Sequence, residues 1–241
     1  MTLNSAARSI EPMSRSVTKK KFFTTLFSMI AGIAVFMGPL AGVAADVATF
    51  GAFGSGDLEG WQTKVFKGET RYTVMKDGDG FAVEAISQGT ASGLVHEMTV
   101  DLTETPCLIW SWKVDTVLEG LDETTKAGDD FPARVYVVVS GGLFFWNTRA
   151  LNYVWSGSHP VEATWPNPYT SQSTMVAAQS GQSRAGQWVM ESRHVADDFK
   201  RFAGVDIEEI DAVAIMTDTD GSGLSATAYY RDIRFSATCD L

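Results

Sequence analysis

Ten short runs of β-branched, aromatic and aliphatic residues follow one another along this chain, each separated from the next by turn-forming residues. They lie at residues 71–75, 81–86, 94–100, 108–114, 134–139, 151–155, 174–178, 188–195, 212–217 and 227–235. Runs of this length are typical of strands, and many in succession predict a sandwich or barrel. Only residues 195–202 have helical spacing, with Phe199 and Phe202 on one face. We therefore expect an all-β, two-sheet β-sandwich of jelly-roll type with one or two short helices.

Alternation within the runs predicts which side chains form the core. Leu108, Trp110, Trp112 and Val114 alternate with more polar residues, which gives the run one large apolar face. We expect both tryptophans to be core residues. The sequence Asp77-Gly78-Asp79-Gly80 predicts a tight hairpin between the first two runs.

The first 45 residues have the organisation of a secretory signal peptide. Lysines at 19–21 end a basic segment, residues 22–40 are almost entirely apolar or small, and Val43-Ala44-Ala45 matches a cleavage site. The alternative is an uncleaved anchor, because the apolar run is long enough to span a bilayer; the Gly38-Pro39 break favours cleavage. We expect residues 1–45 to be removed, a single β-sandwich domain over residues 46–241, and a periplasmic or secreted location in a bacterium.

Without residues 1–45 the chain is strongly acidic. It keeps 14 basic and 28 acidic residues, a net charge of −14. This argues against nucleic acid or an anionic membrane surface as a partner and suits cation binding. Cys107 and Cys239 could pair in an oxidising compartment, although spacing does not show proximity and two free thiols are the alternative.

A loop from residue 122 to residue 134 carries six ionisable side chains and enters a β-branched strand. Its acids could bind a cation, orient sugar hydroxyls or act as general acid and base. These acids are Asp122, Glu123, Asp129 and Asp130. Arg134 alternates to the same face as Tyr136, and such a pair can recognise a carboxylate or a sugar. The alternative is a structural ion-pair cluster on a solvated loop.

Residues 144–169 are rich in aromatic side chains among Gly, Asn, Ser and Pro. A flat ring can cover the apolar face of a sugar while a neighbouring amide binds its hydroxyls. We expect Tyr153 and Trp155 to lie in the core. The candidates for ligand contact are Asn152, Asn167 and two tryptophans expected to be exposed, Trp146 and Trp165.

The sequence Asp218-Thr219-Asp220-Gly221 resembles the start of a calcium loop, with oxygen ligands at alternate positions before a glycine. The distal glutamate of an EF-hand is missing, so that motif is excluded. Asp218 and Asp220 are the candidate metal ligands, with calcium as the ion. The alternative is a turn in which the aspartates bond to their own backbone.

Several blocks of the chain resemble the DUF3047 family of uncharacterised exported bacterial proteins. They are residues 110–115, 122–139, 150–155, 165–170, 214–220 and 228–235. The family has no known function, so the resemblance implies no chemistry. Residues 53–61 and 232–235 are more loosely similar to the ends of galactose-binding-like jelly rolls. That likeness implies a carbohydrate-binding type of sandwich, with a structural calcium near Asp57 or Asp232.

Two classes of function fit these features. The first is an exported binding module for a carbohydrate or other polar cell-envelope ligand. The alternative is a glycan-directed hydrolase or lyase that uses a carboxylate pair, Asp129 or Asp130 with Glu191 or Asp218. No nucleophile elbow, phosphate loop or dinucleotide motif is present, which favours the binding module.

Overall fold

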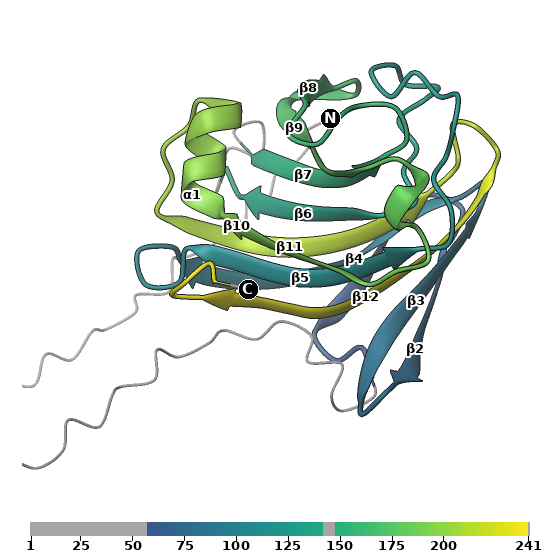
Figure 1. Ribbon diagram of the computed structural model, residues 1–241. Helices are drawn as coiled ribbons and strands as arrows, with labels where there is room; N and C mark the ends of the chain where they lie inside the picture. The colour runs from purple at the N-terminus through teal and green to yellow at the C-terminus, as the bar shows by residue number, and fades with distance from the viewer. Residues whose placement is uncertain (1–56, 142–147, 241) are drawn as a thin grey trace, which may run out of the picture. The chain divides into compact units, whose positions relative to one another are not determined.

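Two β-sheets pack face to face in this computed structural model, which describes residues 57–141 and 148–240 (Figure 1). The seven-stranded sheet has the order β1 (Trp61–Lys67), β4 (Ala91–Asp101), β11 (Glu209–Asp218), β6 (Arg134–Val139), β7 (Arg149–Ser156), β9 (Thr170–Ser180) and β8 (Thr164–Asn167). The five-stranded sheet has the order β10 (Val189–His194), β5 (Cys107–Val114), β12 (Ser225–Ser236), β3 (Gly80–Gln88) and β2 (Arg71–Asp77). Neighbouring strands are antiparallel, except that β7 and β9 are parallel.

The order of the strands defines a jelly roll. The last two strands do not pair with each other; β11 lies between β4 and β6, and β12 lies between β3 and β5 in the other sheet. This interleaving of late and early strands across two sheets is the pattern of a jelly roll. The predicted two-sheet β-sandwich is therefore confirmed, and so is the hairpin, in which Asp77 pairs with Gly80.

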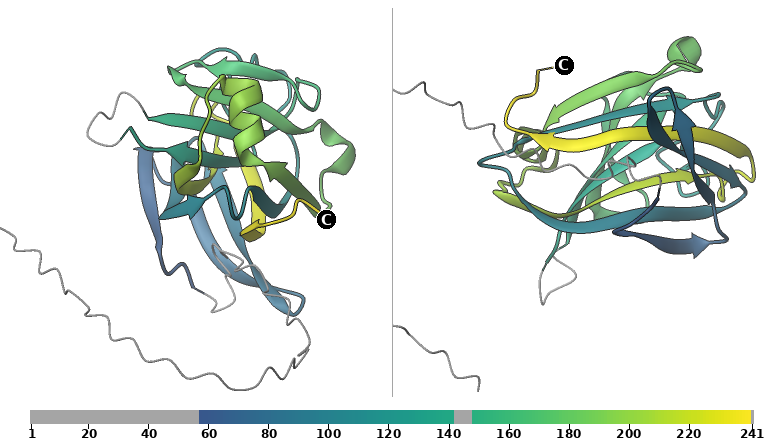
Figure 2. Two further views of the ribbon diagram at one scale, coloured as in Figure 1. Left: turned by 90° about the vertical axis from the view of Figure 1, so that its left-hand side faces the viewer. Right: turned by 90° about the horizontal axis from the view of Figure 1, so that it is seen from below.

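Short helical segments cover one end of the strands (Figure 2, left-hand view). α1 (Val195–Asp198) begins at His194, whose ring accepts a hydrogen bond from the Asp197 N–H, and continues into a π-helical turn, η4 (Phe199–Ala203). Gly204, in the left-handed region at φ 68°, ends the segment. A 3-10 turn, η3 (Gln182–Arg184), precedes β10. The helix expected at residues 195–202 is thus present.

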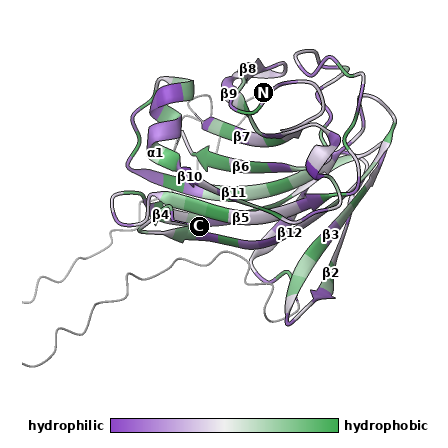
Figure 3. Cartoon of the chain, in the orientation of Figure 1, coloured by the Kyte–Doolittle hydropathy of each residue, from purple (hydrophilic) through white to green (hydrophobic). Residues whose placement is uncertain are grey.

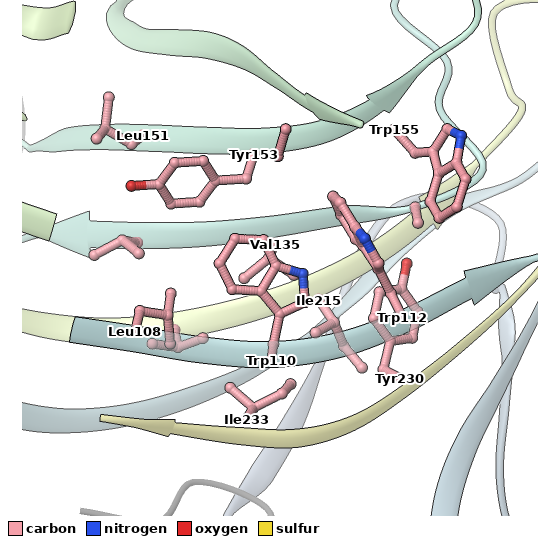
Figure 4. Packing of buried hydrophobic residues seen from close by; sticks show 14 of the residues in the cluster. Leu108, Trp110, Trp112, Val135, Leu151, Tyr153, Trp155, Ile215, Tyr230 and Ile233 are labelled. Carbon is pink, nitrogen blue, oxygen red and sulfur yellow. The ribbon is translucent and has the colours of Figure 1, made fainter. Parts of the chain in front are cut away.

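Aromatic side chains from both sheets fill the core (Figure 4). Trp110 and Trp112 of β5 are fully buried, as predicted, and they meet Tyr153 and Trp155 of β7 at ring-centroid distances of 5.3 and 5.8 Å. Tyr153 and Trp155 are also fully buried, which confirms their expected place in the core. Figure 3 shows the hydrophobic residues concentrated along strands such as β5 and β6.

A disulfide joins Cys107, at the start of β5, to Cys239, just beyond β12, with 5.1 Å between the two Cα atoms. It links the C-terminal segment to a central strand of the five-stranded sheet, and the pairing considered from the sequence is present.

Alternation on β6 divides its side chains between the two faces of the seven-stranded sheet. Val135 and Val137 belong to the core between the sheets. Arg134 and Tyr136 therefore lie on the opposite face, which we call the outer face, as alternation predicted. No helix within residues 57–141 and 148–240 is long and apolar enough to span a membrane. The predicted signal peptide and Trp146 lie outside the described residues.

Candidate functional site

The outer face contains a cavity of about 580 Å³, called the hollow below. Its polar lining consists of Asp129, Arg134, Tyr136, Asn167, Ser173 and Asp218. Its apolar lining consists of Ala91, Ala150 and Met216. The aromatic residues Phe66 and Tyr169, together with Lys67, Thr170 and Asp220, complete the lining. These residues come from all seven strands of the sheet and from the loops beside them, so the hollow depends on the whole seven-stranded sheet.

Arg134 is the central charged group of the hollow and is only 2% exposed. Its Nε donates to Asp218 Oδ1 at 2.7 Å, and its Nη1 donates to Asp129 Oδ1 at 3.3 Å. Its Nη2 donates to the other oxygen of Asp218 and to the backbone carbonyl of Asp129. The guanidinium also lies 4.5 Å from the centroid of the Phe131 ring. Arg134 therefore joins the charged loop to the end of β11.

Burial changes the proton affinity of the groups around Arg134. It raises the pKa of Asp218 to about 7, against the opposing effect of the Arg134 charge. It raises the pKa of Asp129 in the same way, again opposed by Arg134. Burial also raises the pKa of Tyr136 to about 12. The phenol is therefore neutral at physiological pH, and Asp218 changes charge near neutrality.

The raised pKa of Asp218 predicts a pH dependence of stability. The folded protein holds this proton more tightly than the unfolded chain, where the carboxyl has its ordinary pKa of 3.8. The contribution of Asp218 to the free energy of unfolding is therefore complete below pH 3.8 and declines as the pH rises to about 7. We expect Asp218→Asn to flatten this part of a Tm–pH profile, while the exposed control Glu104→Gln leaves it unchanged. Equal slopes for wild type and Asp218→Asn would contradict the assignment.

Glu123 anchors the charged loop from inside the protein. It is 1% exposed and accepts hydrogen bonds from Ser156 Oγ at 2.5 Å and from the Gly157 N–H at 2.7 Å, and its Oε2 lies 2.8 Å from His159 Nδ1. Trp165 donates from Nε1 to the Glu123 carbonyl at 3.1 Å and stacks on the His159 ring at 4.1 Å. Trp165 is thus buried, at 7% exposed, and the expectation that it would be exposed was wrong. Glu123 and Trp165 therefore hold the charged loop in place, and neither of them lines the hollow.

Asp130 connects the charged loop to the turn after β11. Its two oxygens accept hydrogen bonds from the backbone N–H groups of Gly221 at 3.1 Å and Ser222 at 2.6 Å. Gly128 lets the loop fold back on itself, because a Cβ atom there would lie 2.2 Å from the Asp122 carbonyl oxygen. The charged loop is therefore held at both ends, by Glu123 and by Asp130.

Three carboxylates meet beside the hollow: Asp130, Asp218 and Asp220 each place one oxygen within 4.8 Å of the others. The two candidate metal ligands are thus brought together with a third acid, and the group could hold a metal ion. Lys67 Nζ lies 3.5 Å from Asp220 Oδ2 and already supplies a positive charge at this end.

Other predicted site residues lie elsewhere. Asp122 is exposed and accepts hydrogen bonds from Thr124, away from the hollow. Glu191 accepts hydrogen bonds from Trp112 Nε1 and Gln179 Nε2, so it does not line the hollow with the acids of the charged loop. Asn152 is fully buried on β7; its Nδ2 contacts Met175 Sδ at 3.3 Å, and its Oδ1 has no partner. Among the described residues, Asp57 and Asp232 join no metal-sized cluster of acids.

One aromatic residue that lines the hollow, Phe66, was not predicted from the sequence. Phe66 is the additional residue of a β-bulge, because Val65 pairs with Ser92 and Lys67 pairs with the adjacent Ala91. A bulge redirects the side chain that it inserts, and Phe66 is 65% exposed while lining the hollow. An exposed apolar pair, Val65-Phe66, between two lysines is the signal that could have indicated it.

The fold and the hollow define a jelly-roll β-sandwich with a ligand-sized cavity on one sheet face. The chain belongs to the DUF3047 family, described as proteins of unknown function, whose model matches residues 59–234. The resemblance found in the sequence is thereby confirmed. No curated protein matches the chain.

Solved structures with similar folds include two modules from Clostridium thermocellum. The family 11 carbohydrate-binding module of the cellulase Lic26A-Cel5E is 10% identical, with a TM-score of 0.46 and coverage of 82% of this chain and 98% of that one. The family 30 module of Cel9D-Cel44B is 11% identical, with a TM-score of 0.42 and coverage of 75% and 93%. A Rhodothermus marinus Cel12A cellulase derivative is 10% identical, with a TM-score of 0.43 and coverage of 71% and 94%. At these low scores, the similarities identify no ligand or reaction for this chain.

Proposed function

We propose that this protein binds a glycan in the hollow. One observation carries the proposal: two exposed aromatic rings, Phe66 and Tyr169, line the same cavity as a group of buried polar side chains. A pyranose has an apolar face that a flat aromatic ring can cover and a rim of hydroxyls that carboxylates and amides can bind. A cavity of about 580 Å³ has the size of a small-ligand site.

Tyr169 is held in place for such a contact. Its hydroxyl donates to the Lys126 carbonyl at 3.1 Å, and Lys126 Nζ lies 5.1 Å from the ring centroid. Its N–H donates to Asn167 Oδ1 at 3.0 Å. The ring is nevertheless 59% exposed, so a ligand would find a large apolar surface that is already oriented.

The proposed activity is binding without turnover. Of the carboxylate pairs predicted for a hydrolase or lyase, only Asp129 with Asp218 lines the hollow, and Arg134 is bonded to both. An acid–base pair in glycoside hydrolysis needs one carboxyl to donate a proton and the other to attack or activate water. The shared arginine holds both carboxylates in hydrogen bonds within the protein, which favours recognition over catalysis.

We also propose that the protein is exported and acts in the periplasm or outside the cell. The signal-peptide pattern of residues 1–45 supports this location, and the Cys107–Cys239 disulfide is typical of an oxidising compartment. Calcium, the ion predicted for Asp218 and Asp220, is the alternative occupant of this acidic end, with Asp130 as the third ligand.

Removing the Tyr169 ring should weaken glycan binding. Loss of an aromatic contact at the centre of a site costs about 1–3 kcal/mol, which corresponds to a Kd raised roughly 10- to 100-fold. We expect this for Tyr169→Ala in calorimetric titrations with cellotetraose. Tyr169→Phe, which keeps the ring, should bind almost as tightly as wild type.

The matched control is Met190→Ala, which removes an exposed apolar side chain of β10 in the other sheet and should not change the Kd. Equal affinities for wild type and Tyr169→Ala would contradict the proposed site. Release of shortened oligosaccharide by the wild-type protein would contradict binding without turnover.

A further inference from the structure

The hydrogen-bond donors that line the hollow are largely engaged within the protein. Arg134 directs its donors at Asp129 and Asp218. Asn167 Nδ2 lies 3.4 Å from Asp129 Oδ2, and the Tyr169 hydroxyl donates to a backbone carbonyl. These groups have little donor capacity left for a ligand, because each polar hydrogen serves one strong bond.

The carboxylates that line the hollow, by contrast, can still accept further hydrogen bonds. Each carboxylate oxygen can accept more than one hydrogen bond, and Asp129, Asp218 and Asp220 all line the hollow. Ser173, on β9, adds a buried hydroxyl that can both accept and donate: the residue is 8% exposed, lines the hollow, and its Oγ has no hydrogen-bond partner. A buried polar atom without a partner is costly, so a ligand that bonds to it gains free energy. The hollow therefore favours a ligand rich in donors.

The charges in and beside the hollow also favour a ligand that donates hydrogen bonds, and in particular one with a positive charge. Four carboxylates, on Asp129, Asp130, Asp218 and Asp220, face two cations, Arg134 and Lys67. With all four acids ionised the cluster has two more negative charges than positive ones, and with the Asp218 proton retained it still has one more. Arg134 is buried and committed to its two aspartates, so an anionic sugar would find no free buried cation. A cationic group would relieve the repulsion among the acids.

The acidic end brings three carboxylates close enough to one another to surround one ammonium group. Three acceptors at hydrogen-bond distance from one tetrahedral nitrogen lie about 4.6 Å apart, and oxygens of Asp130, Asp218 and Asp220 lie within 4.8 Å of one another. An ammonium group already occupies one side: Lys67 Nζ donates to the Asp220 carbonyl at 2.7 Å and lies 3.5 Å from its carboxylate. The Lys67 side chain is 64% exposed, so a ligand amine could replace it.

We propose that the glycan bound in the hollow is an amino sugar with a free amine, whose ammonium group sits against Asp218 and Asp220. This inference rests on the proposed glycan site and adds the chemical class of its ligand. The aromatic rim contacts the apolar face of the sugar, and the acids and Ser173 accept hydrogen bonds from its ammonium and hydroxyl groups.

The test compares β-1,4-linked tetrasaccharides by calorimetry at a pH below the pKa of the sugar amine. Cellotetraose and the glucosamine tetramer differ at C2, where the first carries a hydroxyl and the second an ammonium. A charge-assisted hydrogen bond is worth about 1.5–3 kcal/mol, so we expect the glucosamine tetramer to bind roughly 10- to 100-fold more tightly. A β-1,4-linked glucuronate tetramer should bind more weakly than both.

Two variants should shift this preference in opposite directions. Asp220→Asn should reduce the ratio of affinities between the glucosamine tetramer and cellotetraose. Lys67→Ala should increase that ratio, because it removes the competing ammonium group. The control Glu104→Gln, at an exposed residue that does not line the hollow, should leave the ratio unchanged.

The outcomes separate the two proposals. Equal affinity for the glucosamine tetramer and cellotetraose, or tighter binding of the glucuronate tetramer, would overturn the amino-sugar inference and leave the glycan site standing. Binding of none of the three would overturn the glycan site and the inference with it. Tight binding of Ca²⁺ alone that is abolished by Asp220→Asn and that blocks the glucosamine tetramer would make the acids a metal site, which also overturns the inference.

Discussion

Arg134→Met should destabilise the sandwich by about 3–5 kcal/mol, because it leaves buried carboxylates without their cation. Asp129 and Asp218 are 7% and 2% exposed, and Arg134 is the residue that bonds to both. The free energy of unfolding, measured by urea denaturation of wild type and variant, tests this expectation. A loss below about 1 kcal/mol would show that the cluster contributes little.

A second variant separates the loss of charge compensation from the loss of packing. In Arg134→Met with Asp218→Asn, one buried carboxylate is removed together with the cation. We expect this double variant to recover part of the lost stability, so that the effects of the two substitutions are not additive. If the two substitutions had strictly additive effects on the free energy of unfolding, the pairing of Arg134 with Asp218 would be contradicted.

Loss of the disulfide should have the next largest effect. Cys107 and Cys239 are separated by 132 residues, and a crosslink that closes so long a loop restricts the unfolded chain by about 5 kcal/mol on the loop-entropy estimate. Measured values are often smaller, so we expect a loss of about 3–5 kcal/mol for the variant with serine at both positions. Urea denaturation of that variant and of the oxidised and reduced wild type provides the measurement.

The reduced wild type is the matched control for the serine variant. Both lack the crosslink but differ in side chain, so their midpoints should agree within experimental error. Reduction without any change in midpoint would contradict a stabilising role for this bond.

Most of the fold could be predicted from the sequence because its strands are buried on at least one face. Alternation in β5 and β6 fixed which side chains enter the core, and the structure bears this out for Trp110, Trp112 and Val135. Two strands at the edges of the seven-stranded sheet were not predicted. Six of the seven residues of β1 are exposed, and β8 has only four residues, one of them proline. Both are strands because they pair with a neighbour, and local sequence does not encode that pairing.

Only part of the candidate site could be predicted from the sequence. Alternation correctly placed Arg134 and Tyr136 on one face, but it could not divide the acids of the charged loop into different roles. Glu123 and Asp130 are anchors because their partners, Ser156 and the Gly221–Ser222 backbone, lie far away in the sequence. The expectation for Trp165 failed for the same reason, since the Glu123 carbonyl satisfies its indole N–H inside the protein. Long-range hydrogen bonds decide which polar side chains remain available to a ligand.

A crystal structure of the protein with a bound β-1,4-linked tetrasaccharide would test glycan binding in the hollow directly. We expect a sugar ring against Tyr169, with its polar groups directed at Asp129, Asp218 and Ser173 in the hollow. A sugar bound instead to the outer face of the five-stranded sheet, or contacts to none of these residues, would contradict it.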